Sequence, residues 1–270
     1  MEFTEAEHMI CNTARLVEED KTYWIMMIGP PQMAIHLALC LHAPNLNYFT
    51  EDGTVAPRPQ LPSWQGVAGV PNFSSKASYR AAMWTTMNTI GYFGQIGMID
   101  YGILECLQID PFGNVNHSLV GGTYDAPRRR FGGAGGANEI ASCCWRLIIT
   151  TRQEKRKFVP KVDFVSIPGY LDGSPGARER AGLPANTGPY RVITPDAMFG
   201  YDEQTRRMKL IALSPWSTVD GVLGEMGFEP LVADKLDVLA PPTEAELRPL
   251  REIVDPPPSV VHLEGKTFTV

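Results

Sequence analysis

The sequence predicts an α/β fold built on an open, mostly parallel sheet flanked by helices. Residues 22–28 are apolar and end at Gly29 and two prolines, and such a short run is typical of a strand covered on both faces. A helical segment at 33–42 and a second strand at 46–50 follow. A strand, a helix and a strand within about 30 residues form a βαβ unit, whose strands are parallel by default. The whole chain, residues 1–270, is expected to form one domain.

Helix signals lie towards both ends of the chain. Residues 4–19 carry apolar side chains at helical spacing, and Thr4 is the expected N-cap. Thr218 is expected to cap a later helix. Thr243 is followed by Glu246 three residues on, which is the spacing of a capping box and predicts another helix start.

The middle of the chain alternates strands with turns. Residues 110–114 (Asp-Pro-Phe-Gly-Asn) have turn chemistry, so the flanking strands at 103–109 and 115–120 are expected to form a hairpin-like connection. The segment 54–80 is rich in Pro, Gly and Ser and is expected to be an irregular loop near the end of the second strand. A short helix leading into a strand is expected over 140–150, and further strands at 161–167, 189–194 and 208–213.

Composition excludes several classes of function. The net charge of −6 disfavours a general nucleic-acid binder, because phosphate backbones are held by clustered Lys and Arg. No apolar run approaches the roughly 20 residues that cross a bilayer. The first residues show neither the basic nor the apolar stretch of a signal peptide, so a cytoplasmic location is expected.

Familiar cofactor and metal motifs are incomplete. Asn138 stands where a dinucleotide fingerprint needs its third glycine, and Val260 stands where a P-loop needs its first. The five histidines include no HExxH pair, and the five cysteines no CxxC, so no metal is expected. The cysteines are expected to be buried free thiols.

Two features remain as candidates for chemistry. Glu51 directly follows a predicted strand, and parallel sheets bind ligands beyond the carboxyl ends of their strands. The run 131–138 contains four glycines, which let backbone N–H groups approach a ligand closely. Taken alone, however, a glutamate at a strand end is more often a solvated or capping residue, and a glycine run is usually only a turn.

Several ordered motifs resemble those of a known family. The chain is similar, over about residues 5–256, to the B subunits of glutaconate CoA-transferases, which are β-type subunits of family I coenzyme A transferases. The motifs that carry the resemblance are Gln108–Asn116, Phe131–Asn138, Glu154–Arg156, Pro168–Gly173 and Arg178–Pro184.

The resemblance implies a fold, a nucleophile and a cradle of amide donors. The fold is that of family I CoA-transferases, which is NagB-like, with a glycine-rich loop at the active site. Glu51-Asp52-Gly53 takes the place of the family's Glu-Ser-Gly or Glu-Asn-Gly motif, so Glu51 is the implied catalytic residue although the middle residue differs. The family's GxGGx motif implies oxyanion and CoA-binding roles for Gly133, Ala134, Gly135, Gly136, Ala137 and Asn138.

The resemblance also implies partners and substrates. The active site of the family lies between two subunits, so an α-type subunit is expected as partner, in a heterodimer or a larger oligomer. A coenzyme A ester and a small carboxylic acid are the implied substrates, with no permanently bound cofactor.

Alternatives stay open on the same fold. Relatives that decarboxylate an acyl-CoA or hydrolyse a ring in a CoA-linked intermediate lack the glutamate nucleophile, so Glu51 favours transfer; a non-catalytic binding subunit is a third reading. Residues 128–130 and 155–157 are basic and either meet CoA phosphates or form solvated faces. Asp110, Asn114 and Asn116 are expected to stabilise a turn. Four aromatic residues are candidates either for a substrate pocket or for the core: Trp64, Trp84, Tyr92 and Phe93.

Overall fold

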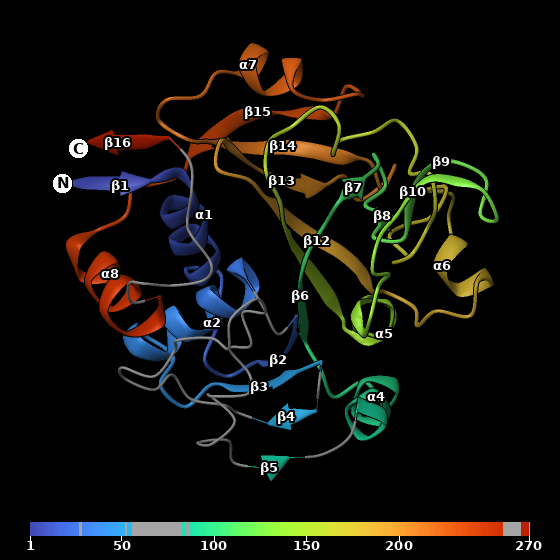
Figure 1. Cartoon of the computed structure of the whole chain (residues 1–270), viewed down its shortest axis with the longest axis horizontal. Coiled ribbons are helices and arrows are strands. Elements are labelled where there is room, and N and C mark those ends of the chain that lie inside the picture. Colours follow the sequence, from blue (N-terminus) through green and yellow to red (C-terminus); the bar gives the residue numbers. More distant parts are fainter. Residues whose placement is uncertain (27–28, 52, 56–82, 85–86, 256–265, 270) are drawn as a thin grey trace.

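A ten-stranded sheet with helices on both faces dominates the structure (Figure 1). The computed structural model describes residues 1–26, 29–51, 53–55, 83–84, 87–255 and 266–269. The loop expected over 54–80 therefore lies outside the described residues, apart from Thr54 and Val55. These two residues form a short strand.

The strand order confirms the predicted open, mostly parallel sheet. It is β15-β14-β13-β12-β11-β6-β2-β3-β4-β5. The central strands from β12 to β3 run parallel, as do β14 and β15, whereas β13, β4 and β5 pair antiparallel with their neighbours. The bounds are β2 Thr22–Ile25, β3 Asn47–Thr50, β4 Thr54–Val55, β5 Met83–Trp84, β6 Tyr101–Glu105, β11 Arg146–Thr150, β12 Gly188–Ile193, β13 Ala197–Tyr201, β14 Met208–Leu213 and β15 Leu231–Val238.

The central strands divide the core into two halves, and helices cover each half. One half contains side chains of α1 (Glu5–Ala14) and α2 (Pro30–Leu41), and the other contains side chains of α5 (Ala137–Cys143), which lies beside α4 (Met87–Gln95). Successive residues of a strand point to opposite faces. Accordingly β2 sends Tyr23 and Ile25 to the first half and Trp24 to the second.

Capping residues begin the helices as predicted. Thr4 and Thr243 each form a complete capping box, and Thr218 accepts the amide of Gly221. These caps start α1, α7 (Val219–Gly224) and α8 (Glu244–Pro249); α6 covers Ala177–Arg180, and a π-helical turn, Leu250–Val254, continues α8.

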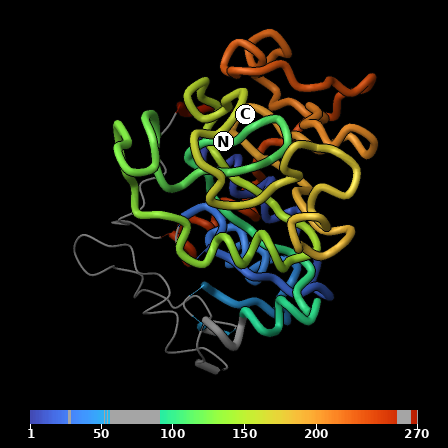
Figure 2. Tube along the Cα trace, turned by 90° about the vertical axis from the view of Figure 1, so that its right-hand side faces the viewer, coloured from blue at the N-terminus to red at the C-terminus, as the bar shows by residue number. Residues whose placement is uncertain are grey.

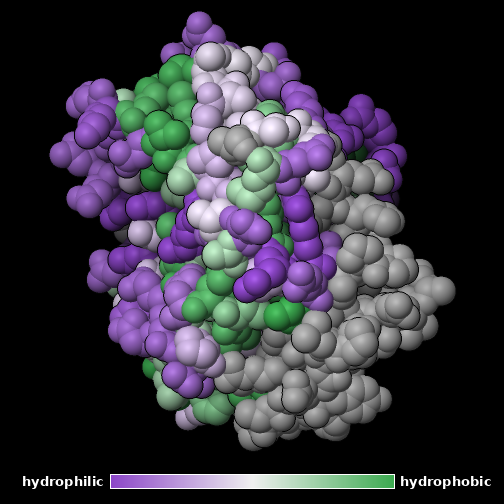
Figure 3. All heavy atoms as spheres, turned by 90° about the vertical axis from the view of Figure 1, so that its left-hand side faces the viewer, coloured by the Kyte–Doolittle hydropathy of each residue, from purple (hydrophilic) through white to green (hydrophobic). Residues whose placement is uncertain are grey.

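The two chain ends come together on one side of the molecule. Strand β1 (Glu2–Thr4) pairs antiparallel with β16 (Thr267–Thr269). Beside them, Arg251 forms an ion pair with Glu7 at 2.6 Å, and Arg15 forms one with Glu246 at 2.7 Å, so α8 and the turn after it are tied to α1. Figure 3 shows this side, where hydrophilic side chains surround separate groups of apolar ones.

Several sequence predictions of secondary structure were wrong, either in extent or altogether. The first helix ends at Ala14 rather than near residue 19, because the amides of Leu16 and Val17 bond to carbonyls only three residues back. The strand expected over 103–109 breaks after Glu105, and residues 108–109 form β7, which leaves the main sheet. Residues 161–167 form no strand: Ile167 makes a single bridge to Val115.

The turn at 110–114 holds the predicted hairpin. Strands β7 (Gln108–Ile109) and β8 (Val115–Asn116) pair antiparallel across it. Oδ1 of Asp110 accepts the amides of Phe112 and Asn114, each at 3.0 Å, and Oδ1 of Asn114 in turn accepts the amides of Gly169 and Leu171. The expected structural role of these side chains is confirmed, and the motif at 168–173 is fastened to the same turn.

A second hairpin stands out from the body. Strands β9 (Leu119–Gly122) and β10 (Pro127–Arg130) form it, and it projects from the rest of the molecule (Figures 1 and 2). In the part of the chain that the structure describes, no helix has both the length and the apolar character needed to span a bilayer. All five cysteines are free thiols; Cys11, Cys106 and Cys144 are buried.

His8 should make stability depend on pH. Its ring is buried between α1 and Trp216, and burial lowers its pKa from 6.5 to about 4. The unfolded chain therefore binds the proton more readily, so stability is lost as the pH falls from 6.5 to 4. The expected loss from this group is about 3 kcal/mol. Thermal melts of wild type and His8→Phe between pH 4 and 7 test this: the variant keeps a ring but cannot titrate, so its melting temperature should vary less. Identical pH profiles would contradict the assignment.

Candidate active site

Glu51 leaves the sheet at the carboxyl edge of its central strands. It follows β3, and its amide donates to the carbonyl of Ile25 on β2 at 3.2 Å. The chain then turns back: the amide of Gly53 donates to the Thr50 carbonyl at 3.0 Å, and β4 pairs antiparallel with β3. Gly53 has a φ of +90°, a conformation that side chains rarely adopt, so the turn needs this glycine. The half-buried Glu51 is thereby held on a tight turn rather than on a long loop.

The glycine loop meets this carboxylate. Gly133 and Gly135 have φ values of +93° and +54°, and the loop leads directly into α5. The Gly136 amide donates to Oε2 of Glu51 at 3.3 Å. A Cβ atom built on Gly135 would lie 3.4 Å from the same oxygen. Two segments 85 residues apart in the sequence therefore meet at one carboxylate.

The other residues of the glycine loop form hydrogen bonds that hold the loop in place. The Gly133 amide donates to the His117 carbonyl at 3.3 Å, and the Ala137 amide donates to the Ala134 carbonyl at 2.9 Å. The Asn138 side chain donates to the Ser166 carbonyl at 2.7 Å. Among the described residues, none would lie within 4 Å of a Cβ on Gly133, so none of them fills the space beside the loop there. Of the predicted site residues, the structure thus brings Gly135 and Gly136 to Glu51, while Asn138 anchors the loop.

Sequence reasoning missed a second carboxylate at this edge. Glu105 ends β6, and a Cβ on Gly29 would lie 3.1 Å from its Oε2. In the strand register Ile25 lies opposite both Thr50 and Ile103. Glu51 comes one residue after Thr50, whereas Glu105 comes two residues after Ile103. Because successive residues alternate between the two faces, the side chains of Glu51 and Glu105 point to opposite faces of the sheet. The second carboxylate was missed because the strand was predicted to run to residue 109, which put Glu105 in the interior of the strand rather than at its end.

The Glu105 carboxyl should lower stability at neutral pH. Burial raises its pKa, and the charges of Lys157 and Arg152 oppose the shift only in part. A carboxyl with a raised pKa contributes stability below its unfolded pKa, and this is lost as the pH rises through the folded pKa. Glu105→Gln should therefore melt at a higher temperature than wild type at pH 7, with the gain vanishing towards pH 4. A variant that is less stable at pH 7 would show that the charge is needed.

Other sequence candidates lie elsewhere. Residues 128–130 run along the exposed strand β10, where Arg129 stacks over Phe131. The Lys157 ammonium donates to the Cys106 carbonyl at 2.9 Å. Tyr92 is 59% exposed, whereas Trp64 and the side chain of Trp84 lie outside the described part of the chain. Over the residues with described positions, no three His, Cys, Asp or Glu side chains are grouped as metal ligands.

Comparisons with known proteins point to one protein family. A family model described as coenzyme A transferase matches residues 72–225. The chain is 45% identical over 149 residues to the B subunit of glutaconate CoA-transferase from Acidaminococcus fermentans, an alignment that covers 55% of this chain and 54% of that relative. It is 31% identical over 227 residues to the B subunit of 3-oxoadipate CoA-transferase from Pseudomonas knackmussii, covering 84% of each.

Solved structures extend the likeness to the whole fold. The crystal structure of glutaconate coenzyme A-transferase from Acidaminococcus fermentans matches with a TM-score of 0.80 and 30% identity, covering 93% of this chain and 94% of that chain. The decarboxylase AibA/AibB matches with a TM-score of 0.76, but at 21% identity it shares the fold alone. The fold is that of a CoA-transferase subunit. The chain belongs to the coenzyme A transferase family.

Proposed function

We propose that this chain is the β-type subunit of a heteromeric CoA-transferase in which Glu51 carries coenzyme A between two carboxylic acids. The observation that carries the proposal is the contact between the Gly136 amide and Oε2 of Glu51 at the carboxyl edge of the sheet. A carboxylate that meets a backbone N–H donor in this position supports the roles of nucleophile for Glu51 and oxyanion donor for the glycine loop. The substrates would be CoA esters and free acids, with no further cofactor, and a cytoplasmic location fits such substrates.

The reaction would proceed through two exchanges at one carboxylate. Glu51 attacks the acyl-CoA carbonyl, and the tetrahedral adduct expels CoA as a thiolate, which leaves a mixed anhydride of the acyl group and Glu51. The thiolate then attacks the glutamyl carbonyl, which forms a glutamyl-CoA thioester and releases the first acid as its carboxylate. A second carboxylate reverses these steps and departs as the new CoA ester. One thioester replaces another, so the exchange needs no energy source.

The glycine loop would stabilise the charge that develops in each step. Every attack turns a carbonyl oxygen into an oxyanion, and preorganised N–H donors are often the largest single source of rate enhancement for such reactions. Gly136 already donates to Glu51, so its amide is placed to follow the glutamyl oxygen through the reaction. The amides of Gly133 and Ala137 already donate to backbone carbonyls, and these bonds hold the loop in shape. We therefore assign the donor role to Gly135 and Gly136 before the rest of the motif.

An α-type subunit would complete the site. Two relatives of this chain are named as B subunits of CoA-transferases, and none of the described residues fills the space beside Gly133. We expect the chain alone to be inactive and the pair formed with an α-type subunit to transfer CoA.

Trapping the intermediate tests this proposal. The co-expressed pair is incubated with an acyl-CoA without an acceptor acid, digested and examined by peptide mass analysis. A CoA adduct on the peptide containing Glu51 supports transfer. Turnover without such an adduct would favour a decarboxylase or a ring-opening hydrolase on the same fold, and turnover by the chain alone would refute the need for a partner. A screen of CoA esters with the same pair then identifies the acids.

A further inference from the structure

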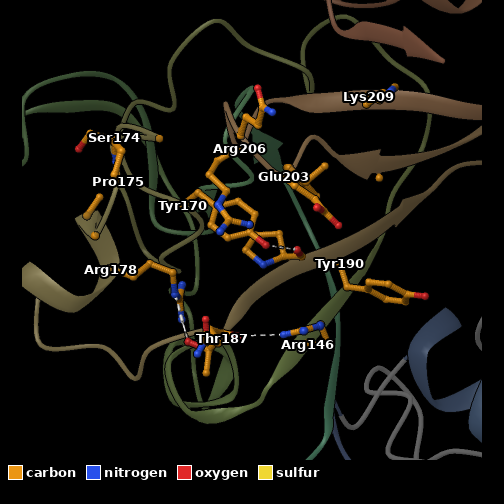
Figure 4. Close-up of a pocket in the computed structure, with 18 of the residues that line it drawn as sticks. Arg146, Tyr170, Ser174, Pro175, Arg178, Thr187, Tyr190, Glu203, Arg206 and Lys209 are labelled. Atoms are coloured by element: carbon orange, nitrogen blue, oxygen red, sulfur yellow. Dashed lines mark hydrogen bonds between the residues drawn. The ribbon is translucent and has the colours of Figure 1, made fainter. Parts of the chain in front are cut away.

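A large cavity lies at the opposite edge of the sheet from Glu51. Its volume is about 720 Å³, and it is lined by the first residues of β11, β12 and β14, the end of β13, and the segment 170–187 (Figure 4). Arg146, which begins β11, lines it, whereas Thr150 at the other end of β11 pairs with Glu105. The full length of a strand therefore separates the cavity from the Glu51 edge. Its volume is typical of sites for small molecules.

The lining is positively charged although the chain has a net charge of −6. The acidic residues of the lining are Glu179 and Glu203. None of the ion pairs formed by described residues includes a residue of the lining. The cavity thus gathers more cationic than acidic groups, and among the described residues none of these cations forms an ion pair. The basic residues are Arg146, Arg178, Arg191, Arg206 and Lys209.

Arg178 places one of these charges inside the protein. Its side chain is 4% exposed and donates to the carbonyls of Pro168, Gly169 and Ala141 and to Oγ1 of Thr187, all uncharged acceptors. Burial lowers its pKa to about 10, so it remains charged at neutral pH. A buried cation whose hydrogen bonds go only to neutral groups is costly unless negative charge lies near, and the nearby Glu179 offsets the effect of burial only in part. Arg178 raises the positive potential at the wall of the cavity.

Two further arginines are held over aromatic rings. The Arg206 guanidinium lies 5.2 Å from the centre of the Tyr170 ring, and that of Arg191 lies 3.8 Å from the centre of the Tyr190 ring. Figure 4 shows Arg206 directly over Tyr170. Stacking leaves the N–H edge of a guanidinium available for hydrogen bonds, and an oriented arginine loses less freedom on binding.

Unfavourable backbone conformations gather around the same cavity. In the described ranges, the non-glycine residues with left-handed φ values are Leu171 (+59°), Asn186 (+60°) and Arg206 (+57°). Asn186 and Arg206 line the cavity, and Leu171 follows Tyr170, which does so too. Such conformations persist where the surroundings fix them, and they cluster at ligand sites. Around Arg206, the side chain of Asp202 fixes the turn by accepting the amides of Gln204 and Thr205.

We propose that this cavity binds a small phosphorylated anion. Guanidinium groups match the oxygens of a phosphate in pairs, and a phosphorylated ligand carries enough charge to balance the excess of cations. The cavity is large enough for a diphosphate together with an attached organic group. The proposal is independent of the one made for Glu51, because it concerns other residues at the other edge of the sheet.

Calorimetric titration of the full chain tests the site. The ligands are pyrophosphate and ADP, with citrate as a tricarboxylate of comparable charge. We expect saturable binding of both phosphorylated ligands, weakened at least tenfold in the variant Arg191→Ala/Arg206→Ala and weakened by added salt. Arg207→Ala is the matched control: this residue donates to the Glu229 carbonyl and is not part of the lining, so affinity should stay within twofold.

The outcomes separate the proposal from its alternatives. Melting curves first establish that both variants are folded. Absence of binding at millimolar ligand, or equal affinity in wild type and the double variant, overturns the proposal, the latter because the ligand then binds elsewhere. Citrate binding without binding of either phosphorylated ligand overturns the choice of phosphate. Loss of binding when an α-type subunit is added also overturns it, because the cavity would then be a subunit interface.

Discussion

Replacing Glu51 by Gln should reduce CoA transfer by a factor on the order of 10⁴ or more, as removal of a catalytic nucleophile does in other acyl-transfer enzymes. Glutamine has the same shape, and its carbonyl oxygen can still accept the Gly136 amide. An amide, however, does not attack a thioester, so no glutamyl-CoA can form. The measurement is kcat/KM of the pair with an α-type subunit, together with the CoA adduct.

Two further variants make this result specific. Glu51→Asp keeps a carboxylate but shortens it by one methylene, so it should leave partial activity. Glu225→Gln, at an exposed position after α7, should transfer at the wild-type rate. If Glu51→Gln kept more than about a tenth of the wild-type rate, Glu51 would not be the nucleophile, since loss of a nucleophile costs far more than tenfold.

The sequence predicted the sheet edge better than it predicted the site. The apolar run at 22–28 and the strand at 46–50 were enough to place Glu51 after a parallel strand, and the structure confirms that position. The contact between Glu51 and Gly136 was expected only from the family resemblance. Nothing in either segment specifies a partner 85 residues away, because that contact depends on how α5 packs against the sheet.

Elements with weak local signals were missed for physical reasons. Strand β15 is the edge of the sheet and is mostly exposed, so charged residues such as Asp234, Lys235 and Asp237 interrupt any apolar pattern. Such charges are common on edge strands because they hinder pairing with other chains. Strand β4 is only two residues long. The positively charged cavity was not predicted for another reason. Its basic residues are spread over positions 146–209 and form no local run in the sequence.

Replacing Gly169 by Ala should prevent stable folding of the chain. A Cβ atom at this position would lie 2.2 Å from the carbonyl carbon of Gly113 and 2.4 Å from the Asn114 nitrogen. These are backbone atoms of the turn that Asp110 and Asn114 fix, so they cannot shift without breaking the hydrogen bonds of that turn. The turn cannot move away from Gly169 towards β12 either, because Gly113 lies against Pro189 and Tyr201.

The expected loss is more than about 4 kcal/mol, the range reached when overpacking and loss of a buried hydrogen-bond network combine. For a chain of this size that corresponds to a fall in melting temperature of about 10 °C or more, or to insoluble expression. Gly224→Ala is the control, since a Cβ there would meet nothing within 4 Å and alanine favours the helix α7. If Gly169→Ala melted within about 3 °C of wild type, less than the shift expected from 2 kcal/mol, the two motifs would not be locked together by this backbone crossing. The turn at 110–114 and the segment at 168–173 would then owe their association to side-chain hydrogen bonds alone.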